Sequence, residues 1–210
     1  GALGLDNIKN MKLISKQDLE KDLKLRFDSK TALVTFHPVT LEKESPKKQF
    51  EKLLKAFEKF HELKLIFTMP NSDTGGREII AMINKYSEQR ENAYAFTNLG
   101  QKRYLSTLKY VDLVIGNSSS GIVEVPFMGI PTLNIGDRQK GRIMGESIVN
   151  VKCDEREIVK GITACLNRKK AIGKMKNPYG NGTAAKQMLN IIKKKTGKKK
   201  KKKKFFDLDF

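Results

Sequence analysis

The sequence has few of the residues that build disulfide scaffolds and metal sites. Its 210 residues include two cysteines, Cys153 and Cys165, and two histidines. The cysteine spacing fits no metal-binding or redox motif, so we expect free thiols in a reducing compartment, the cytoplasm, and no metal or other cofactor. No secretory signal is visible at the start of the chain. Because the chain begins with Gly1 rather than Met, we expect a processed, tagged or partial protein.

Long apolar runs are also missing. No run reaches the roughly 18 residues that a membrane-spanning helix needs, so we expect no membrane partner. Apolar residues make up 39% of the chain, which suits a globular protein. The length is sufficient for one ordinary domain with a hydrophobic core.

Acidic residues are scarce relative to basic ones. The chain has 42 Lys and Arg against 23 Asp and Glu, a net charge of +19. Ten of the lysines lie within residues 193–204, and two aspartates lie in residues 205–210. Removing those ten positive and two negative charges leaves +11 on residues 1–192, which suits an anionic ligand. We interpret 193–210 as a solvated lysine-rich tail.

A module that binds polyanions through this tail is one alternative. It predicts strongly salt-dependent binding to nucleic acid that is lost on deletion of residues 193–204. The rest of the chain has no aromatic-rich basic pattern and no known nucleic-acid motif. Nucleic acid is therefore not an expected partner.

Short apolar runs alternate with amphipathic stretches along most of the chain. Such alternation, with runs buried on both faces, predicts an α/β fold with a Rossmann-like parallel sheet and helices on both faces. Ser45 and Pro46 are typical of a helix start, and Phe50, Leu53 and Phe57 follow at helical spacing. Expected strands cover 31–36, 63–68, 94–96, 113–115, 132–135 and 148–151, and further expected helices cover 77–88, 102–110, 122–129, 155–166 and 183–194.

Polar residues follow four of the expected strands. In parallel sheets of this kind, ligands bind beyond the carboxyl ends of the strands. The clearest case is GNSSSG at 116–121, between a strand and a helix, where free backbone N–H groups, the positive helix end and serine hydroxyls favour an anion. Glu124, near the end of the first helical turn, is a candidate acceptor for a ribose diol. The other strand ends carry HPVT at 37–40, MPNSDTGG at 69–76 and GDRQKGR at 136–142.

Each of these residues also has a purely structural interpretation. The serine turn alone is consistent with a capped turn that holds no ligand, and His37 with a loop histidine. Asn71 is also consistent with a residue that only stabilises the turn before a helix. Arg138 and Arg142 can be solvated loop charges. Convergence of all four loops on one edge of the sheet favours a phosphate site with an acceptor for sugar hydroxyls.

Four motifs together resemble the hydrolysing UDP-N-acetylglucosamine 2-epimerases, of the type that serves sialic-acid-precursor synthesis. They are FHPVT at 36–40, PNSDTG at 70–75, GNSSSG at 116–121 and GDRQKGR at 136–142, and GESIV at 145–149 continues the likeness. The resemblance covers roughly residues 1–190. It implies the C-terminal half of a two-domain GT-B-type fold, with residues 1–30 as an interdomain junction, 31–192 as the nucleotide-binding domain and an N-terminal domain missing.

The same resemblance implies roles for individual residues. His37 would contact the diphosphate and assist the departure of UDP, and Asn71 would help to close the site. Leu99 would lie beside the uracil. The remaining implied ligands are Ser118 and Ser119 for the phosphates, Glu124 for the ribose, Arg138 as positive charge near the nucleotide and Arg142 as a further substrate contact.

The reaction that the resemblance implies removes the C2 proton of the sugar, expels UDP to give a glycal, and adds water to release N-acetylmannosamine. The catalytic carboxylates of the family lie largely in the N-terminal domain, so no general base is assigned here and the isolated chain is expected to have little activity. Full-length family members commonly form homo-oligomers. Two alternatives remain: the same chemistry on a related nucleotide sugar, such as a 4-acetamido-6-deoxy analogue, or the donor-binding half of a GT-B glycosyltransferase.

Overall fold

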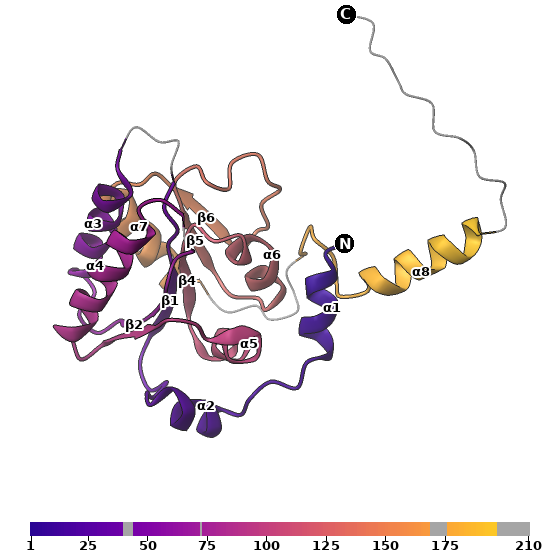
Figure 1. Ribbon diagram of the computed structural model, residues 1–210, viewed down its shortest axis with the longest axis horizontal. Coiled ribbons are helices and arrows are strands. Elements are labelled where there is room, and N and C mark those ends of the chain that lie inside the picture. The colour runs from indigo at the N-terminus through magenta and orange to yellow at the C-terminus, as the bar shows by residue number, and fades with distance from the viewer. Residues whose placement is uncertain (40–43, 72, 169–175, 197–210) are drawn as a thin grey trace, which may run out of the picture.

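The centre of the molecule is a six-stranded parallel sheet. The computed structural model describes residues 1–39, 44–71, 73–168 and 176–196. The strand order is β3-β2-β1-β4-β5-β6, and every neighbouring pair is parallel (Figure 1). The order reverses between β1 and β4, which creates a topological switch point. The strands are β1 Thr31–Thr35, β2 Lys64–Thr68, β3 Ala93–Phe96, β4 Leu113–Gly116, β5 Thr132–Ile135 and β6 Ile148–Val151.

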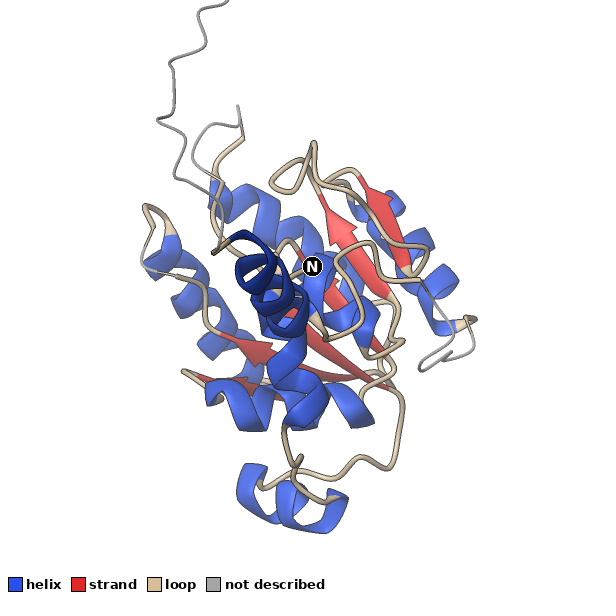
Figure 2. Ribbon diagram, turned by 90° about the vertical axis from the view of Figure 1, so that its right-hand side faces the viewer, coloured by secondary structure: helices blue, strands red, loops and turns tan. Residues whose placement is uncertain are grey.

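Helices cover both faces of the sheet, as the alternating sequence pattern predicts. One face carries α3 (Pro46–Phe57), α4 (Gly76–Glu88) and α7 (Glu155–Leu166). The other carries α1 (Leu3–Asn10), α2 (Lys16–Leu23), α5 (Gly100–Tyr110) and α6 (Ser120–Phe127) (Figures 1 and 2). The last described helix, α8 (Ala184–Lys195), points away from the sheet (Figure 1). The predicted α/β class is confirmed.

Side chains of the central strands alternate between two hydrophobic clusters. In β1, Val34 belongs to the cluster under α3, α4 and α7, and Leu33 to the cluster under α5 and α6. The same alternation separates Phe67 from Ile66 in β2. All of these side chains are at most 1% exposed. Continuous apolar runs are needed here because a parallel sheet with helices on both sides has no solvent-facing surface.

The sequence pattern did not predict α1 or α2. Both are eight residues long, a length at which an isolated helix is marginal in water. Each is stabilised by apolar anchors that reach the second cluster, such as Leu5 and Leu19, which have no exposed surface. Asp6 of α1 also accepts hydrogen bonds from the backbone N–H groups of Ala184 and Ala185 at 3.0 and 3.1 Å, which caps α8.

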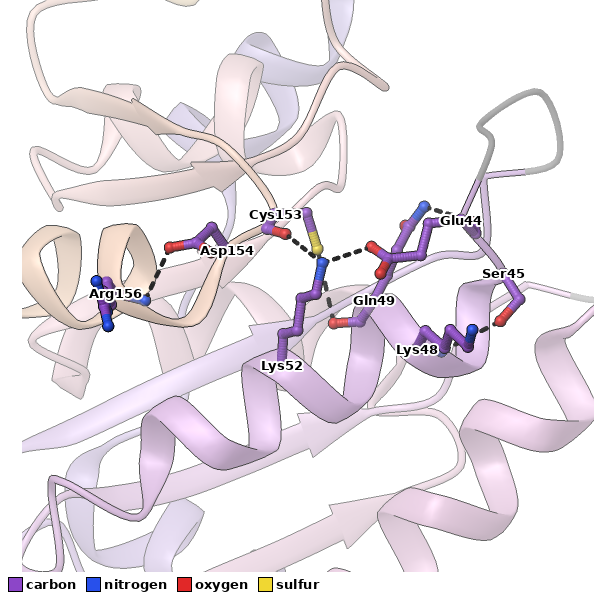
Figure 3. A network of polar contacts seen from close by, with 8 residues as sticks. All are labelled: Glu44, Ser45, Lys48, Gln49, Lys52, Cys153, Asp154 and Arg156. Atoms are coloured by element: carbon purple, nitrogen blue, oxygen red, sulfur yellow. Dashed lines mark hydrogen bonds and ion pairs between the residues drawn. The ribbon is translucent and has the colours of Figure 1, made fainter.

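A polar network joins α3 to the segment between β6 and α7 (Figure 3). Lys52 donates to Glu44 Oε2 at 2.7 Å and to the carbonyl of Cys153 at 3.3 Å. Bonding to Glu44 raises the pKa of Lys52, so this lysine stays charged. Ser45 caps α3 by accepting from the N–H of Lys48 at 3.4 Å, as the sequence predicts.

Several sequence-based expectations fall on residues outside the described ranges. Thr40, Ser72 and the run Lys198–Lys204 are among them, and only residues 193–196 of the lysine-rich tail are described. Cys153 and Cys165 are free thiols, and burial raises the pKa of Cys165 to about 11. Among the described residues, no helix combines the length and the apolar character that crossing a membrane requires.

Candidate functional site

A cleft of about 610 Å³ lies at the carboxyl end of the sheet, where the strand order reverses. Its walls come from the segments that follow β1, β2, β3 and β4. Four of the residues predicted from sequence line it: His37, Asn71, Leu99 and Ser118. Leu99 is 5% exposed and directly precedes α5. The structure thus brings together side chains that are 81 residues apart in sequence, from His37 to Ser118.

The floor of the cleft depends on a close approach of β1 and β4. Gly116 ends β4 with φ at 137°, and a Cβ at this position would lie 1.9 Å from the carbonyl oxygen of Thr35. Only glycine permits this contact. Beside it, the hydroxyls of Thr35 and Thr68 lie 2.6 Å apart and join the ends of β1 and β2. The serine turn therefore starts within hydrogen-bonding distance of the end of β1.

His37 is held in one protonation and tautomeric state. Its Nδ1 accepts a hydrogen bond from the backbone N–H of Asn71 at 3.1 Å. Burial lowers the pKa of His37, the positive charge of Arg138 lowers it further, and the Asn71 bond and Asp73 partly oppose both effects. The imidazole is therefore neutral near pH 7, and because Nδ1 is an acceptor, its single proton lies on Nε2.

The turn after β4 presents serine hydroxyls at the start of α6, while the N–H groups of Gly121 and Ile122 donate to carbonyls within the turn. Ser118 lines the cleft and its carbonyl accepts from the N–H of Gly121 at 3.1 Å. Ser119 is the N-cap residue of α6 and is exposed, without a side-chain capping bond. The positive end of the α6 dipole adds to the attraction for an anion.

Glu124 lies one helical turn after Ser120, partly buried between α6 and α1. The hydroxyl of Tyr104 donates to Ser120 Oγ at 2.8 Å, and Ser120 in turn interacts with Glu124. Burial raises the pKa of Glu124, and bonds from backbone and Ser120 offset part of this effect. Burial also raises the pKa of Tyr104 to about 12, so its hydroxyl stays a donor. Glu124 does not line the main cleft, whereas Ser120, with which it interacts, does.

The two predicted arginines occupy different places. Arg138 donates to the carbonyl of Asn117 at 3.1 Å and lies near enough to His37 to affect its pKa. Arg142 is exposed and lines a second cleft of about 480 Å³ beyond β5 and β6, which also includes Lys140 and Lys152. The structure therefore brings Arg138, but not Arg142, close to His37. Within the described part of the chain, no three His, Cys, Asp or Glu side chains cluster in a way that would hold a metal.

Sequence reasoning missed three residues that shape this site. Tyr104 lies on a helix whose sequence gives no functional signal. Asn117 belongs to the quoted GNSSSG motif, but its position at a turn gave no reason to expect a side-chain role. Gln139 is 2% exposed and donates to the carbonyl of Asn117 at 2.8 Å. A buried glutamine inside a loop of charged residues is a signal only once its burial is known.

The comparison that decides the family covers almost the whole described chain. The family model for UDP-N-acetylglucosamine 2-epimerase matches residues 1–193. The chain belongs to this family. It corresponds to the C-terminal part of the hydrolysing enzymes of the family.

Individual relatives agree with this assignment. A GDP/UDP-N,N'-diacetylbacillosamine 2-epimerase (hydrolyzing) of Campylobacter jejuni is 40% identical over 156 residues, which are 74% of this chain and 41% of the relative. Polysialic acid biosynthesis protein P7 of Escherichia coli is 35% identical over 201 residues, 92% of this chain and 50% of the relative. The solved UDP-GlcNAc 2-epimerase from Neisseria meningitidis, bound to UDP-GlcNAc, has a TM-score of 0.66 at 17% identity, over 91% of this chain and 52% of that one. The chain thus spans about half the length of the relatives that it matches.

Proposed function

We propose that this chain is the UDP-sugar-binding half of a hydrolysing UDP-N-acetylglucosamine 2-epimerase, which converts UDP-N-acetylglucosamine and water into N-acetylmannosamine and UDP. The observation that carries the proposal is that His37 and Ser118 line one cleft, at the switch point of the sheet. In α/β folds of this kind the switch point is where nucleotides bind.

The diphosphate would lie between the serine turn and His37. The hydroxyls of Ser118 and Ser119 supply donors without a charged side chain, and Arg138 supplies positive charge. Neutral His37 would donate its Nε2 proton to a phosphate oxygen. Because negative charge accumulates on UDP as it leaves, preorganised donors of this kind stabilise the transition state more than the bound substrate.

The nucleoside would occupy the other end of the cleft. Leu99, buried at the start of α5, offers an apolar surface beside which the uracil can pack. Glu124 would accept hydrogen bonds from the ribose hydroxyls at the side of the cleft, where it interacts with Ser120, which accepts from Tyr104. Asn71, on an exposed loop at the cleft, would close over the sugar diphosphate.

The proton at C2 must be removed by a base, and we assign that base to a part of the full-length protein outside this chain. A carboxylate with a tuned pKa suits that step, and we expect it in an N-terminal domain that precedes this half in the full-length protein. We therefore expect the isolated chain to bind UDP and to have little epimerase activity. We also propose that the full-length protein is a homo-oligomer.

A second candidate is the same reaction on a diacetylated 6-deoxy sugar. It is favoured by the 40% identity to the Campylobacter jejuni relative, whose name specifies diacetylbacillosamine. The two sugars share the UDP group and the acetamido group at C2, so they would make the same contacts with this half. The family match favours both of these over a glycosyltransferase.

Calorimetric titration of UDP into the chain tests the proposal. Ser118→Ala should weaken binding by about tenfold to a hundredfold, because a hydrogen bond to a charged group contributes about 1.5–3 kcal/mol. Ser87→Ala is a matched control, since its hydroxyl bonds only a carbonyl of its own helix α4. Equal affinities of both variants and the wild-type chain would contradict the site.

Product analysis of the full-length protein tests the reaction. Incubation with UDP-N-acetylglucosamine should release free N-acetylmannosamine and UDP, and the diacetylated substrate should give the corresponding free sugar if the second candidate is right. Transfer of the sugar to an acceptor, with no free amino sugar, would contradict both epimerase proposals.

A further inference from the structure

Asn117 extends the pairing of β1 and β4 beyond the last residues of the two strands. The regular ladder ends with Thr35 opposite Gly116, and the N–H of Asn117 still donates to the carbonyl of Thr35 at 3.2 Å. Beyond this bond, the side chain of Asn117 replaces the backbone as the hydrogen-bonding partner. Asn117 Oδ1 accepts from the backbone N–H of His37 at 2.7 Å, and Asn117 Nδ2 donates to the carbonyl of His37 at 2.8 Å.

This two-way contact requires an amide. It needs one acceptor and one donor from the same side chain, which asparagine supplies and aspartate does not. Asn117 is 1% exposed, so both bonds are shielded from competing water. The backbone N–H and carbonyl of His37 are therefore both hydrogen-bonded, as they would be inside a strand, although His37 follows the end of β1.

The carbonyl of Asn117 holds a second loop. It accepts from Arg138 Nη1 at 3.1 Å and from Gln139 Nε2 at 2.8 Å. One residue therefore connects three loops that follow β1, β4 and β5. These bonds hold the arginine where its charge acts on His37.

The serine turn gains from the same arrangement, because Ser118 directly follows Asn117 and faces the cleft. Fixing Asn117 on both its side chain and its backbone fixes where that hydroxyl lies relative to the histidine. The two groups that would flank a diphosphate are thus set at a constant separation by a residue that does not line the cleft itself.

We propose that Asn117 is a positioning residue for diphosphate binding, which orients His37 through its side chain and Arg138 through its carbonyl. The inference rests on the proposed function only in naming the diphosphate as the ligand. It adds a residue whose effect reaches the phosphates through other groups. A residue that served the fold alone would not act selectively on phosphate binding.

The two histidines allow the first test without any ligand. Imidazole ¹⁵N and ¹³C NMR spectra of the chain contain signals from His37 and His61 only, and a His37→Gln variant assigns them. In the wild-type chain, the neutral form of His37 should be a single tautomer with Nδ1 unprotonated. Asn117→Ala should populate both tautomers and raise the pKa of His37 towards its ordinary value, because the ring becomes more solvated and moves away from Arg138.

Asn92→Ala is the matched control. Asn92 also donates its side-chain amide to backbone carbonyls, those of His61 at 3.0 Å and Leu63 at 2.9 Å. The Asn92→Ala substitution therefore removes the same kind of hydrogen bond beside His61, away from the cleft. This variant should leave the His37 signals as in the wild-type chain.

The second test compares UDP with uridine by calorimetry. Asn117→Ala should lower the affinity for UDP by about tenfold, the loss expected when one hydrogen bond to a charged group is misaligned, and leave the affinity for uridine unchanged. Asn117→Leu keeps a branched side chain, adds no charge and loses both bonds to the His37 backbone, so it gives the same selective loss if the alanine variant does not fold.

The outcomes separate the two proposals. A folded Asn117 variant with one His37 tautomer and an unchanged ratio of UDP to uridine affinity would overturn the positioning role. Equal loss of UDP and uridine binding would also overturn it, since that is the result of a purely structural residue. A wild-type chain that binds uridine as tightly as UDP would instead contradict the diphosphate site.

Discussion

Replacing Gly116 by alanine should disrupt the contact between β1 and β4 on which the site is built. The added Cβ would lie 1.9 Å from the carbonyl oxygen of Thr35 and 2.7 Å from its carbonyl carbon. Both neighbours are backbone atoms of a buried strand, so no side-chain rotation relieves the overlap. The φ angle of 137° is also one that residues with a Cβ rarely adopt.

The expected cost follows from these two effects. Holding a residue with a Cβ at such a φ angle costs about 1–3 kcal/mol, and overpacking a rigid interior costs about another 1–3 kcal/mol. The variant should therefore lose about 2–6 kcal/mol, out of a typical total of about 5–15 kcal/mol. For a chain of this size, each kcal/mol lowers Tm by about 2–4 °C.

Gly141→Ala separates the two contributions. Gly141 also has a positive φ, 83°, but a Cβ there would meet no atom within 4 Å. This variant should lose only the conformational part, about 1–2 kcal/mol. Urea and thermal unfolding of both variants measure the difference, and UDP titration should reveal weaker binding in Gly116→Ala only. If Gly116→Ala were no less stable than Gly141→Ala, the reasoning about strand contact would be wrong.

Three further predictions concern ionisable groups. Glu124→Gln should weaken UDP binding, because it removes the proposed carboxylate acceptor for the ribose. It should also raise Tm near pH 7, because burial raises the pKa of Glu124 and the carboxylate destabilises the folded state above that pKa. This gain in Tm should shrink as the pH falls through the pKa of Glu124. His37 should take up protons when UDP binds near pH 6.5, because its pKa is lowered in the free chain and the negative diphosphate raises it. Calorimetry in buffers of different ionisation enthalpy measures this proton uptake. Lys52→Met should lower stability by only about 0.5–1 kcal/mol, since Lys52 and Glu44 are both about one-third exposed, and urea unfolding measures it.

Each of these predictions has a contradicting outcome. A Tm gain in Glu124→Gln that does not change with pH would show that a buried charge is not its cause. Proton uptake that persists in His37→Gln would assign the uptake to another group. A loss well above 1 kcal/mol in Lys52→Met would mean that the network of Figure 3 is more strongly coupled than its exposure implies.

The central elements of the fold were predictable because each carries its own signal. The strand Thr132–Ile135 and the helix Glu155–Leu166 have the predicted bounds, and Ser45 caps its helix as expected. The short α1 and α2 were not predictable, because they are stabilised by the packing of residues such as Leu5 and not by a local sequence signal.

For the site, the sequence located the loops but not the contacts between them. Motif spacing and family resemblance led to His37, Asn71 and Ser118, which do lie around one cleft. The link through Asn117 depends on how far the ends of β1 and β4 approach, which no local pattern encodes. Likewise, only the folded chain separates Arg138, beside His37, from Arg142 in the second cleft.

Backbone NMR mapping of UDP on the isolated chain tests the central claim most directly. We predict chemical-shift changes concentrated at residues 35–38, 69–71, 97–101 and 116–120, the segments that surround the main cleft. Changes concentrated at residues 140–152, around the second cleft, would contradict the account, because they would place the nucleotide away from His37 and the serine turn.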